Sequence, residues 1–464
     1  MLMGEFETSV MELLKKFDRP GPRYTSYPTA PLFSETFGRQ DYEDEIARTN
    51  GGENGSHLSL YFHFPFCDTL CYFCGCTTVI TNNRSRLDEY VPRLQAEIDL
   101  LSARIAPGRR VVQMHWGGGT PTYLTPDQIS GVAEYIRRKF SFGNDAEVSV
   151  EIDPRGLTYE HLEALRHGGF NRISLGVQDF NQDVQRAINR NQSEDLTLSA
   201  VENARKLGFS SVNFDLIYGL PNQTVETFDK TLEKVIGLSP NRIAAYNFAY
   251  VPWIKPHQKL IRKEELPTPD MKLRILTRII DRLTNAGYVY IGMDHFAKSD
   301  DELTIAQKNR TLYRNFQGYS TNAGCDLFGL GMSSISHVGK VYAQNAKHLD
   351  AYYAAVDRGL LPTNSGYRMT PDDELRKYVI MRLMCDLVLD IRDVEKRFRI
   401  NFDEYFKSSI DQLRLLFDDG LLRQEGRSIV VTTRGRLFLR NIAMCFDAYL
   451  PGFRTQKPLF SQTV

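Results

Sequence analysis

The chain has 464 residues, 42% of them apolar, and its 57 basic and 57 acidic side chains give a formal net charge of zero. This composition is typical of a globular protein of two or three domains, at roughly 150 residues each, and excludes a nonspecific nucleic-acid binder, which would carry a basic excess. No apolar run approaches the roughly 20 residues of a membrane span, so we expect a cytoplasmic protein with no membrane partner.

The first 55 residues predict an N-terminal arm. They lack an apolar core of signal-peptide length and carry acidic residues early, so we expect them to be retained in the mature protein. A short helical pattern is followed by GPRYTSYPTA, in which Gly21, Pro22 and Pro28 prevent a continuing helix. The arm either lies over the next domain with its tyrosines as packing anchors or closes over a ligand.

Four of the seven cysteines crowd together directly after an alternating apolar run, at Cys67, Cys71, Cys74 and Cys76. Bunched thiols in a reducing compartment favour a metal or redox centre over disulfides. A structural zinc ion would use Cys76 as its fourth ligand, although a cysteine two residues after Cys74 is awkward for one tetrahedral ion. Three thiolates suit a [4Fe-4S] cluster that leaves one iron open. We favour the iron–sulfur interpretation, and we expect the three isolated cysteines to be core residues.

A β/α series follows, in which short strand-forming runs alternate with amphipathic helical patterns. The helical pattern over 126–140 begins with Thr125 and Gln128, which suit a capping box. Near-continuous apolar strands joined by helices predict a parallel sheet covered on both faces, either a barrel or a doubly wound sheet. The predicted strands lie at 60–64, 111–116, 147–152, 172–177, 212–218, 243–250 and 288–293, and C-cap glycines precede three of them, at Gly169, Gly208 and Gly287.

Polar residues gather where the predicted strands end. Glu151, Gln178, Asp215 and Asn247 lie in or just after otherwise apolar runs, and three glycines, 117–119, follow the second strand. Successive glycines let backbone N–H groups approach a ligand. Because the carboxyl ends of parallel strands share one edge of the sheet, we expect the active site there.

The sequence changes character after about residue 365. Helical patterns at 372–389 and 401–422 precede a predicted hairpin at 427–436 and a last helix. This order resembles a winged helix, yet the second helical pattern is mixed in charge, which argues against DNA binding. We therefore predict three parts, an N-terminal arm over 1–55, a catalytic (β/α) domain over 56–360, and a mainly helical, winged-helix-like packing or lid domain over 361–464.

The spacing of the first three cysteines, with Phe73 before the last, and the GGGTP loop resemble the radical S-adenosylmethionine (SAM) superfamily. Further motifs, GPRYTSYPTA, EIDPR, GVQDF, FDLIYGLPNQT, GMDHFA and RNFQGY, together with Cys76, resemble the oxygen-independent coproporphyrinogen III oxidase family. The similarity runs from about Arg23 to the C-terminus, and it implies a partial (β/α) barrel of about six parallel strands.

The resemblance also implies a ligand set. Cys67, Cys71 and Cys74 would hold a [4Fe-4S] cluster, and Cys76 belongs to the family pattern without being a ligand. Positions for SAM match at Tyr61, Gly118, Glu151 and Ile335. Family members are also described with a second SAM, and matching positions are Phe73, Gly119, Thr120, Gln178, Arg190, Asp215 and Ala249.

The activity implied is an oxidoreductase reaction of porphyrin biosynthesis, in which two propionates of coproporphyrinogen III become the vinyls of protoporphyrinogen IX through a 5′-deoxyadenosyl radical. We expect a monomer that takes electrons from a donor such as flavodoxin or ferredoxin. Candidate partners for the substrate carboxylates, chosen by position and charge, are Arg23 and Tyr24 on the arm and Arg155 or Arg314 near the site.

Two alternatives stay open at this point. One is a haem-binding chaperone of the same superfamily, but such relatives typically lack both the fourth cysteine and the PRYTSYPTA arm. The other is a different tetrapyrrole-modifying radical enzyme, which the match over the C-terminal region makes less favoured.

Overall fold

The computed structural model describes residues 11–51, 57–453 and 459–463. Its centre is one sheet of 12 strands in the order β16-β15-β14-β13-β1-β4-β5-β6-β7-β8-β10-β9. The strands from β13 to β8 in this order pair in parallel, and both flanks are antiparallel. The parallel strands are β13 (Asp326–Leu330), β1 (Leu58–Phe64), β4 (Arg110–Gly118), β5 (Ser141–Ile152), β6 (Arg172–Gln178), β7 (Ser211–Tyr218) and β8 (Arg242–Asn247).

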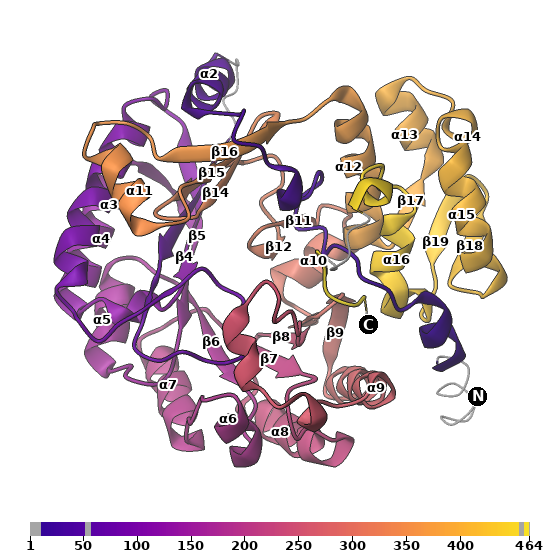
Figure 1. Ribbon diagram of the computed structural model, residues 1–464, viewed down its shortest axis with the longest axis horizontal. Coiled ribbons are helices and arrows are strands. Elements are labelled where there is room, and N and C mark those ends of the chain that lie inside the picture. The colour runs from indigo at the N-terminus through magenta and orange to yellow at the C-terminus, as the bar shows by residue number, and fades with distance from the viewer. Residues whose placement is uncertain (1–10, 52–56, 454–458, 464) are drawn as a thin grey trace.

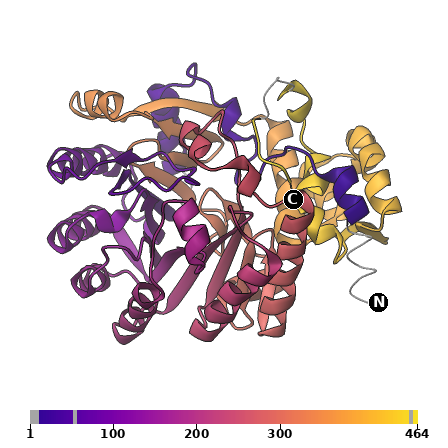
Figure 2. The same ribbon diagram turned by 60° about the horizontal axis from the view of Figure 1, so that its bottom comes forward.

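Helices line the outer side of this sheet in an arc, while its inner side faces the rest of the molecule (Figure 1). The same helices stack along one side when the molecule is turned (Figure 2), so the architecture is an open, partial (β/α) barrel, as predicted. The outer helices are α3 (Arg86–Ser102), α4 (Pro126–Lys139), α5 (Tyr159–His167), α6 (Gln182–Ala187), α7 (Glu194–Lys206), α8 (Val225–Leu238), α9 (Pro269–Asn285) and α11 (Leu349–Val356). Thr125 and Gln128 form the expected capping box of α4.

The antiparallel flanks correct the predicted series at its end. The seventh predicted strand forms as β9 (Tyr288–Gly292), but it pairs with β10 (His295–Lys298) instead of continuing the parallel ladder. Met293 and Asp294 make a tight turn between them, and β10 then pairs with β8. The other flank consists of β14 (Ile335–Val338), β15 (Val341–Asn345) and β16 (Thr363–Arg368), so the large sheet extends past the predicted domain boundary at residue 361.

Several further elements before the C-terminal domain are short. Two short strand pairs are β2 (Phe66–Cys67) with β3 (Val79–Ile80) and β11 (Tyr313–Asn315) with β12 (Gly318–Ser320). Helix α10 is Glu302–Lys308, and the 3-10 helices are η1 (Ala30–Leu32), η2 (Pro121–Tyr123), η3 (Pro256–Leu260) and η4 (Lys263–Glu265).

The C-terminal domain begins with α12 (Pro371–Asp386) and has its own apolar core. The predicted hairpin is displaced: residues 428–431 form its second strand, not its first. Gly426, with a φ of 57°, supplies the left-handed turn that joins the two strands. The remaining elements are β17 (Val388–Asp390), α13 (Ile391–Phe398), α14 (Phe402–Tyr405), α15 (Lys407–Asp418), β18 (Leu422–Glu425), β19 (Ser428–Val431), η5 (Gly435–Phe438), α16 (Leu439–Met444) and η6 (Leu450–Phe453).

The arm connects the two domains. It runs from the C-terminal domain across to the barrel, where helix α2 (Arg39–Asn50) packs against the β14–β16 flank (Figure 1). Tyr24 and Tyr27 are buried in the C-terminal core, and the hydroxyl of Tyr24 donates to Asp447 at 2.9 Å. The arm tyrosines are therefore packing anchors, and the segment around them holds the two domains together.

Within the described ranges, no helix combines the length and the apolar character needed to cross a bilayer.

Candidate active site

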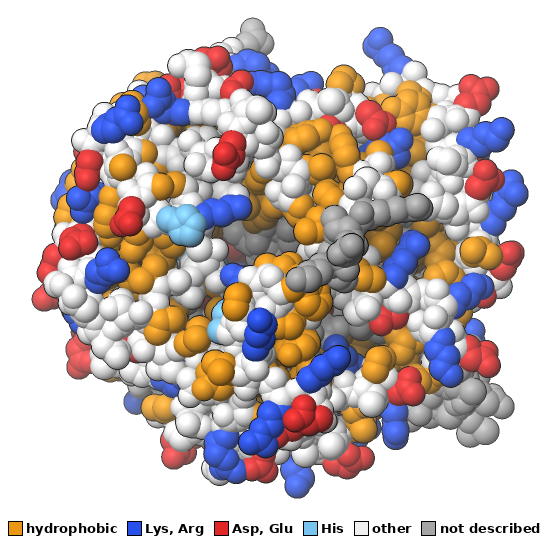
Figure 3. Space-filling model, in the orientation of Figure 1, with side chains coloured by type: hydrophobic (Ala, Val, Ile, Leu, Met, Phe, Trp, Pro, Cys, Tyr) orange, Lys and Arg blue, Asp and Glu red, His pale blue; other side chains and the backbone are white. Residues whose placement is uncertain are grey.

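Two adjoining cavities open at the carboxyl edge of the parallel strands. One, of about 280 Å³, is lined by the four clustered cysteines and by the ends of β4 to β7. The other, of about 520 Å³, lies between the sheet, the arm and the β11–β12 pair. Cys76, Glu151 and Tyr246 line both cavities, so the two share a wall. The molecular surface is hollowed where the barrel meets the C-terminal domain (Figure 3).

The cysteine loop is held from both ends. Cys67 ends β2, which pairs in parallel with β3, and its sulfur lies 3.3 Å from the hydroxyl of Thr120. The backbone N–H of Cys74 donates to the Cys71 carbonyl at 3.1 Å, which closes a turn. Short-range turns and a short strand pair therefore bring all three predicted ligands to one cavity.

The thiols experience different environments. A hydrogen bond from Cys76 lowers the pKa of Cys74 to about 6, and the nearby cations of Lys255 and Arg190 act in the same direction. The same hydrogen bond, together with burial, raises the pKa of Cys76 well above its usual value. Burial raises the pKa of Cys67 to about 12. Cys74 is thus more readily ionised at neutral pH than Cys67 or Cys76.

Two guanidinium groups face the sulfur of Cys71. Arg155 donates to it at 3.4 Å and Arg190 at 3.6 Å, and both arginines also bind the carboxylate of Asp153, at 2.7 Å and 2.9 Å. Burial would raise the pKa of Asp153, but the two arginines outweigh it and lower that pKa. Asp153 belongs to the EIDPR motif, yet we did not single it out, because one acidic residue in a motif gives no sign of which cations it positions.

The residues present fit an iron–sulfur cluster. In the part of the chain that the structure describes, no three His, Cys, Asp or Glu side chains converge closely enough for one metal ion, whereas the three thiols line one cavity wide enough for a larger group. The buried Nε of Arg190 has no hydrogen-bond partner among the described residues. Cationic N–H groups beside a sulfur stabilise anionic thiolate ligands.

Glycines form the other wall of this cavity. Gly118 has a φ of 109°, which disfavours any other residue, and its N–H donates to Glu151 at 3.1 Å. A Cβ on Gly119 would lie 2.7 Å from the backbone of Pro65, so the two chain segments approach closely only because that position is glycine. The glycine run therefore lines the cysteine cavity, but the N–H groups of Gly118 and Gly119 already donate to Glu151 and to the Phe64 carbonyl. That these N–H groups approach a ligand stays a prediction.

A carboxylate lies between the two cavities. Glu151 bonds to His115 at 3.1 Å, and the ring of His115 stacks on Tyr61 with 5.9 Å between centroids. Burial would raise the pKa of Glu151, but His115 and the Gly118 N–H lower it overall. Its side chain keeps 44% of its surface exposed to the cavities. An ionised acceptor is therefore available to a cationic or hydroxylated ligand.

Asp215 and Gln178 line the cysteine cavity further along the sheet. Burial raises the pKa of Asp215 to about 6, although Ser174 and Asn213 donate hydrogen bonds that oppose the shift. Gln178 has a φ of 64°, a left-handed conformation that is costly outside glycine and is concentrated at functional sites.

The second cavity contains buried polar groups without partners among the described residues. They are Nε and Nη1 of Arg314, Nδ1 of His295, and both amide atoms of Gln317. Burying unpaired polar groups is costly, so such a set indicates a ligand that completes them. Arg23 also lines this cavity but already binds Asp294 at 2.5 Å. The sequence indicated Arg314 by its position and charge and did not indicate His295 or Gln317 as ligand-binding residues.

Most predicted site residues line one of the two cavities, but two do not. Tyr24 is buried in the C-terminal core, and Ala249 is placed outside the lining, where its carbonyl accepts a hydrogen bond from Gln258. The residues brought together are Phe73, Gly118, Gly119, Thr120, Arg155, Arg190 and Asp215 in the cysteine cavity, and Tyr61, Ile335, Arg23 and Arg314 in the second one.

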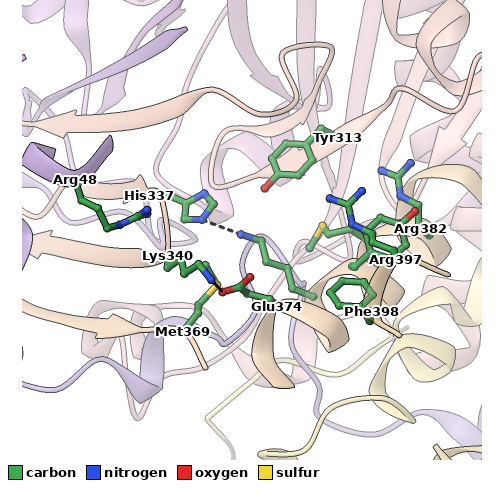
Figure 4. A pocket seen from close by; sticks show the side chains of 13 residues that line it. Arg48, Tyr313, His337, Lys340, Met369, Glu374, Arg382, Arg397 and Phe398 are labelled. Atoms are coloured by element: carbon green, nitrogen blue, oxygen red, sulfur yellow. Dashed lines mark hydrogen bonds and ion pairs between the residues drawn. The ribbon is translucent and has the colours of Figure 1, made fainter. Parts of the chain in front are cut away.

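A third and larger hollow, of about 740 Å³, lies between the β14–β15 hairpin, β11, α12 and α13, with Arg48 and Lys340 on one side and Arg382, Arg397 and Phe398 on the other (Figure 4). It is lined by none of the cysteines. Lys377 donates to Nε2 of His337 there at 2.8 Å, and burial lowers the pKa of this lysine to about 7.

We expect Lys377→Met to stabilise the protein at pH 7 by about 1 to 3 kcal/mol, because an ammonium is no longer desolvated. Since Lys377 binds its proton less tightly in the folded state, wild-type stability should rise between pH 7 and 10. In Lys377→Met the free energy of unfolding should rise less between pH 7 and 10 than in wild type. Chemical denaturation at several pH values measures this difference. Lys347→Met, at an exposed lysine outside this hollow, is the control. An unchanged pH dependence in Lys377→Met would contradict the assignment.

Two family models match the chain, and one of them describes the superfamily that the sequence motifs resemble. The profile of the radical SAM superfamily matches residues 61–235, and that of the HemN C-terminal domain matches residues 369–438, which begin directly after β16.

Similar proteins span almost the whole chain. The oxygen-independent coproporphyrinogen III oxidase of Escherichia coli K12 is 47% identical over 95% of each chain, and that of Synechocystis sp. PCC 6803 is 45% identical over 98% of this chain and 97% of the relative. The solved structure of Escherichia coli coproporphyrinogen III oxidase (HemN), a radical SAM enzyme, superposes with a TM-score of 0.89 at 46% identity, covering 95% of this chain and 98% of the other.

Proposed function

The chain belongs to the oxygen-independent coproporphyrinogen III oxidase family of radical SAM enzymes, and from this premise we propose how its two cavities divide the reaction. The cysteine cavity would hold the [4Fe-4S] cluster and SAM, and the second cavity would hold coproporphyrinogen III. The observation that carries this proposal is their shared wall of Cys76, Glu151 and Tyr246. A substrate in the second cavity would lie beside the cofactors, and Tyr61 and Ile335, which line that cavity, would meet SAM at the shared wall.

We assign the cluster to Cys67, Cys71 and Cys74. Arg155 and Arg190 would stabilise the thiolate of Cys71, and Asp153 would fix both arginines. Glu151, Gly118, Tyr61 and Ile335 would contact SAM where the two cavities meet, with the carboxylate accepting from its ammonium or ribose groups. A second SAM would use the remaining predicted residues of the cysteine cavity, Phe73, Gly119, Thr120, Gln178, Arg190 and Asp215.

When bound, the reduced cluster and SAM supply a 5′-deoxyadenosyl radical that takes hydrogen from a propionate side chain. The residues of this chain orient the substrate and exclude water and oxygen. His115 keeps Glu151 ionised, and the Tyr61 ring packs on His115, so this acceptor has a fixed position. Each propionate radical would then lose carbon dioxide and pass one electron to an acceptor outside this chain, which leaves the vinyl groups of protoporphyrinogen IX.

Arg314 is our foremost candidate for a substrate carboxylate. Its guanidinium lies buried on the cavity wall, over the ring of Tyr319, with two nitrogens that have no partner among the described residues. A guanidinium can bind a carboxylate through two parallel hydrogen bonds. Arg23 and Gln317 line the same cavity and would serve the other carboxylates.

We expect Arg314→Gln to lower kcat/KM by about 10- to 1000-fold, because one charged hydrogen-bonded pair to the substrate is lost. The iron content and the cleavage of SAM without substrate should stay at wild-type levels, since Arg314 does not line the cysteine cavity. Arg314→Lys restores the charge but not the paired donors and should recover activity only in part. Unchanged kcat/KM in Arg314→Gln would remove this residue from the substrate site.

The deciding experiment is an anaerobic assay of the reconstituted protein with coproporphyrinogen III, SAM and a chemical reductant. We expect protoporphyrinogen IX and 5′-deoxyadenosine to form together. Formation of 5′-deoxyadenosine without a decarboxylated product would reject this substrate and retain the radical chemistry. A haem-binding chaperone is not favoured, because the relatives that match nearly the full length carry the oxidase name.

We further propose that the chain acts as a monomer in the cytoplasm, where unpaired thiols persist, and receives electrons from a small carrier protein such as flavodoxin or ferredoxin.

A further inference from the structure

We propose that residues 251–263, between β8 and α9, form the docking surface for a small acidic electron-carrier protein. This inference rests on the proposed function, because the carrier would deliver one electron to the cluster held by Cys67, Cys71 and Cys74. The carrier is oxidised by one electron and the cluster is reduced by one, with no bond made or broken. We call residues 251–263 the docking segment.

The inner side of the docking segment contacts the cysteine loop directly. His257 donates through Nε2 to the Cys74 carbonyl at 2.8 Å, and Lys255 donates to the Cys76 carbonyl at 2.9 Å. The buried Gln258 donates to the Phe73 carbonyl at 3.2 Å and also accepts from the N–H of Val251. A protein seated on this segment is therefore separated from the cysteine loop by a single layer of chain.

The outer side of the docking segment exposes large apolar side chains. Trp253, Ile254 and Leu260 are 40%, 46% and 58% exposed, and these three lie within eight residues of one another in the sequence. Hydrophobic side chains and several Lys or Arg side chains gather just below the central hollow in Figure 3, where Figure 1 places the chain that follows β8. An apolar centre with exposed aromatic residues is typical of protein interfaces.

The charge of this surface selects an acidic partner. On the outer side, Lys259 and Lys263 have no carboxylate within ion-pair distance among the described residues, and Arg262 pairs with Glu265 at 3.1 Å. Residues 251–265 hold the cations Lys255, Lys259, Arg262 and Lys263 against the carboxylates Glu264 and Glu265, so the stretch is net basic. The whole chain has no net charge, so this basic excess is local. Complementary charge accelerates encounter and fixes orientation, and electron-transfer contacts are small interfaces that depend on it. A second copy of this chain that bound through the same surface would place basic side chains opposite basic side chains, which disfavours a homodimer here.

The test uses Lys259→Glu/Lys263→Glu in the cluster-loaded enzyme, with reduced flavodoxin and reduced ferredoxin as the two carriers. Neither lysine lines either site cavity. The control is Lys396→Glu/Lys407→Glu, an equal charge change at exposed positions of α13 and α15. Binding of each carrier is measured by calorimetry at low and high salt, and turnover is measured with each carrier and with dithionite.

We expect the double variant to bind its carrier at least about tenfold more weakly at low salt, with a smaller salt dependence, because rim charges act through screened attraction. Turnover with dithionite should stay within twofold of wild type, while carrier-driven turnover falls. Trp253→Ala should weaken binding without changing the salt dependence.

Three outcomes would each overturn the docking assignment. The double variant could bind the carrier as tightly as wild type, the control variant could bind it as weakly as the double variant, or dithionite-driven turnover could fall as much as carrier-driven turnover. A dimer of the wild-type chain that the double variant abolishes would overturn it as well. If dithionite yields no product even for wild type, the proposed function fails, yet the calorimetry still decides whether this surface binds the carrier.

Discussion

Cys74→Ser will lose the brown cluster absorbance and lower turnover by about 1000-fold or more, which corresponds to at least about 4 kcal/mol of transition-state stabilisation. Serine cannot replace a thiolate that is ionised near neutral pH, and the hydrogen bond from Cys76 lowers the pKa of Cys74 to about 6. Iron and sulfide content per chain after anaerobic reconstitution measures the loss directly, without reference to activity.

Two further replacements make this result specific. Cys325→Ser changes a partly buried cysteine outside both site cavities and should retain iron and activity. Cys76→Ser should keep the iron, since we assign Cys76 no ligand role, and would report what the fourth cysteine adds to turnover. Full iron in Cys74→Ser, or equal iron loss in Cys76→Ser, would contradict the three-ligand assignment.

Asp153→Asn will destabilise the protein by about 3 kcal/mol, because breaking a buried ion pair leaves its partners uncompensated. The carboxylate receives both Arg155 and Arg190, and the side chains of Asp153 and Arg190 are only 16% and 7% exposed. The amide that replaces it carries no charge to hold the two guanidinium groups beside Cys71. We therefore expect incomplete cluster loading as well as a lower denaturation midpoint.

The matched control is Asp183→Asn, which breaks an exposed pair with Arg186 on α6. Exposed pairs contribute little, so this variant should behave like wild type. Wild-type stability together with wild-type iron content in Asp153→Asn would show that the two arginines keep their places without the carboxylate.

The strand series could be predicted because buried parallel strands are short apolar runs between helices, and six of the seven predicted runs form the parallel ladder. The antiparallel pairing of β9 could not be predicted, because its apolar sequence would also suit a parallel strand that continues the ladder. The turn at Met293 and Asp294 decides the pairing with β10. The hairpin predicted over 427–436 was wrong in position, because the run 428–431 pairs across Gly426 with residues 422–425, which precede it, and not with the residues that follow it.

The site residues that belong to sequence motifs could be predicted. Those whose role depends on their neighbours in the fold could not. The cysteine spacing and the glycine run identify one cavity from the sequence alone. The roles of Asp153 and Gln317 appear only when their neighbours are known. Asp153 binds two arginines, and the amide atoms of Gln317 have no hydrogen-bond partners among the described residues. Tyr24 shows the reverse, since a motif residue expected near the substrate is an anchor in another domain.

The position of β1 in the sheet has a consequence for biosynthesis. This strand, which leads into the cysteine loop, lies between β4 and β13, and Leu58 pairs with both Val111 and Asp326. During translation one edge of β1 stays open until β13 has emerged, and distant strand pairing is slow to form and prone to aggregation. The last residue that lines the cysteine cavity is Tyr246, so every residue of that wall has been made before β13, which closes the open edge of β1. The strand that leads into the cysteine loop therefore keeps one edge unpaired after the residues of the cavity itself are present.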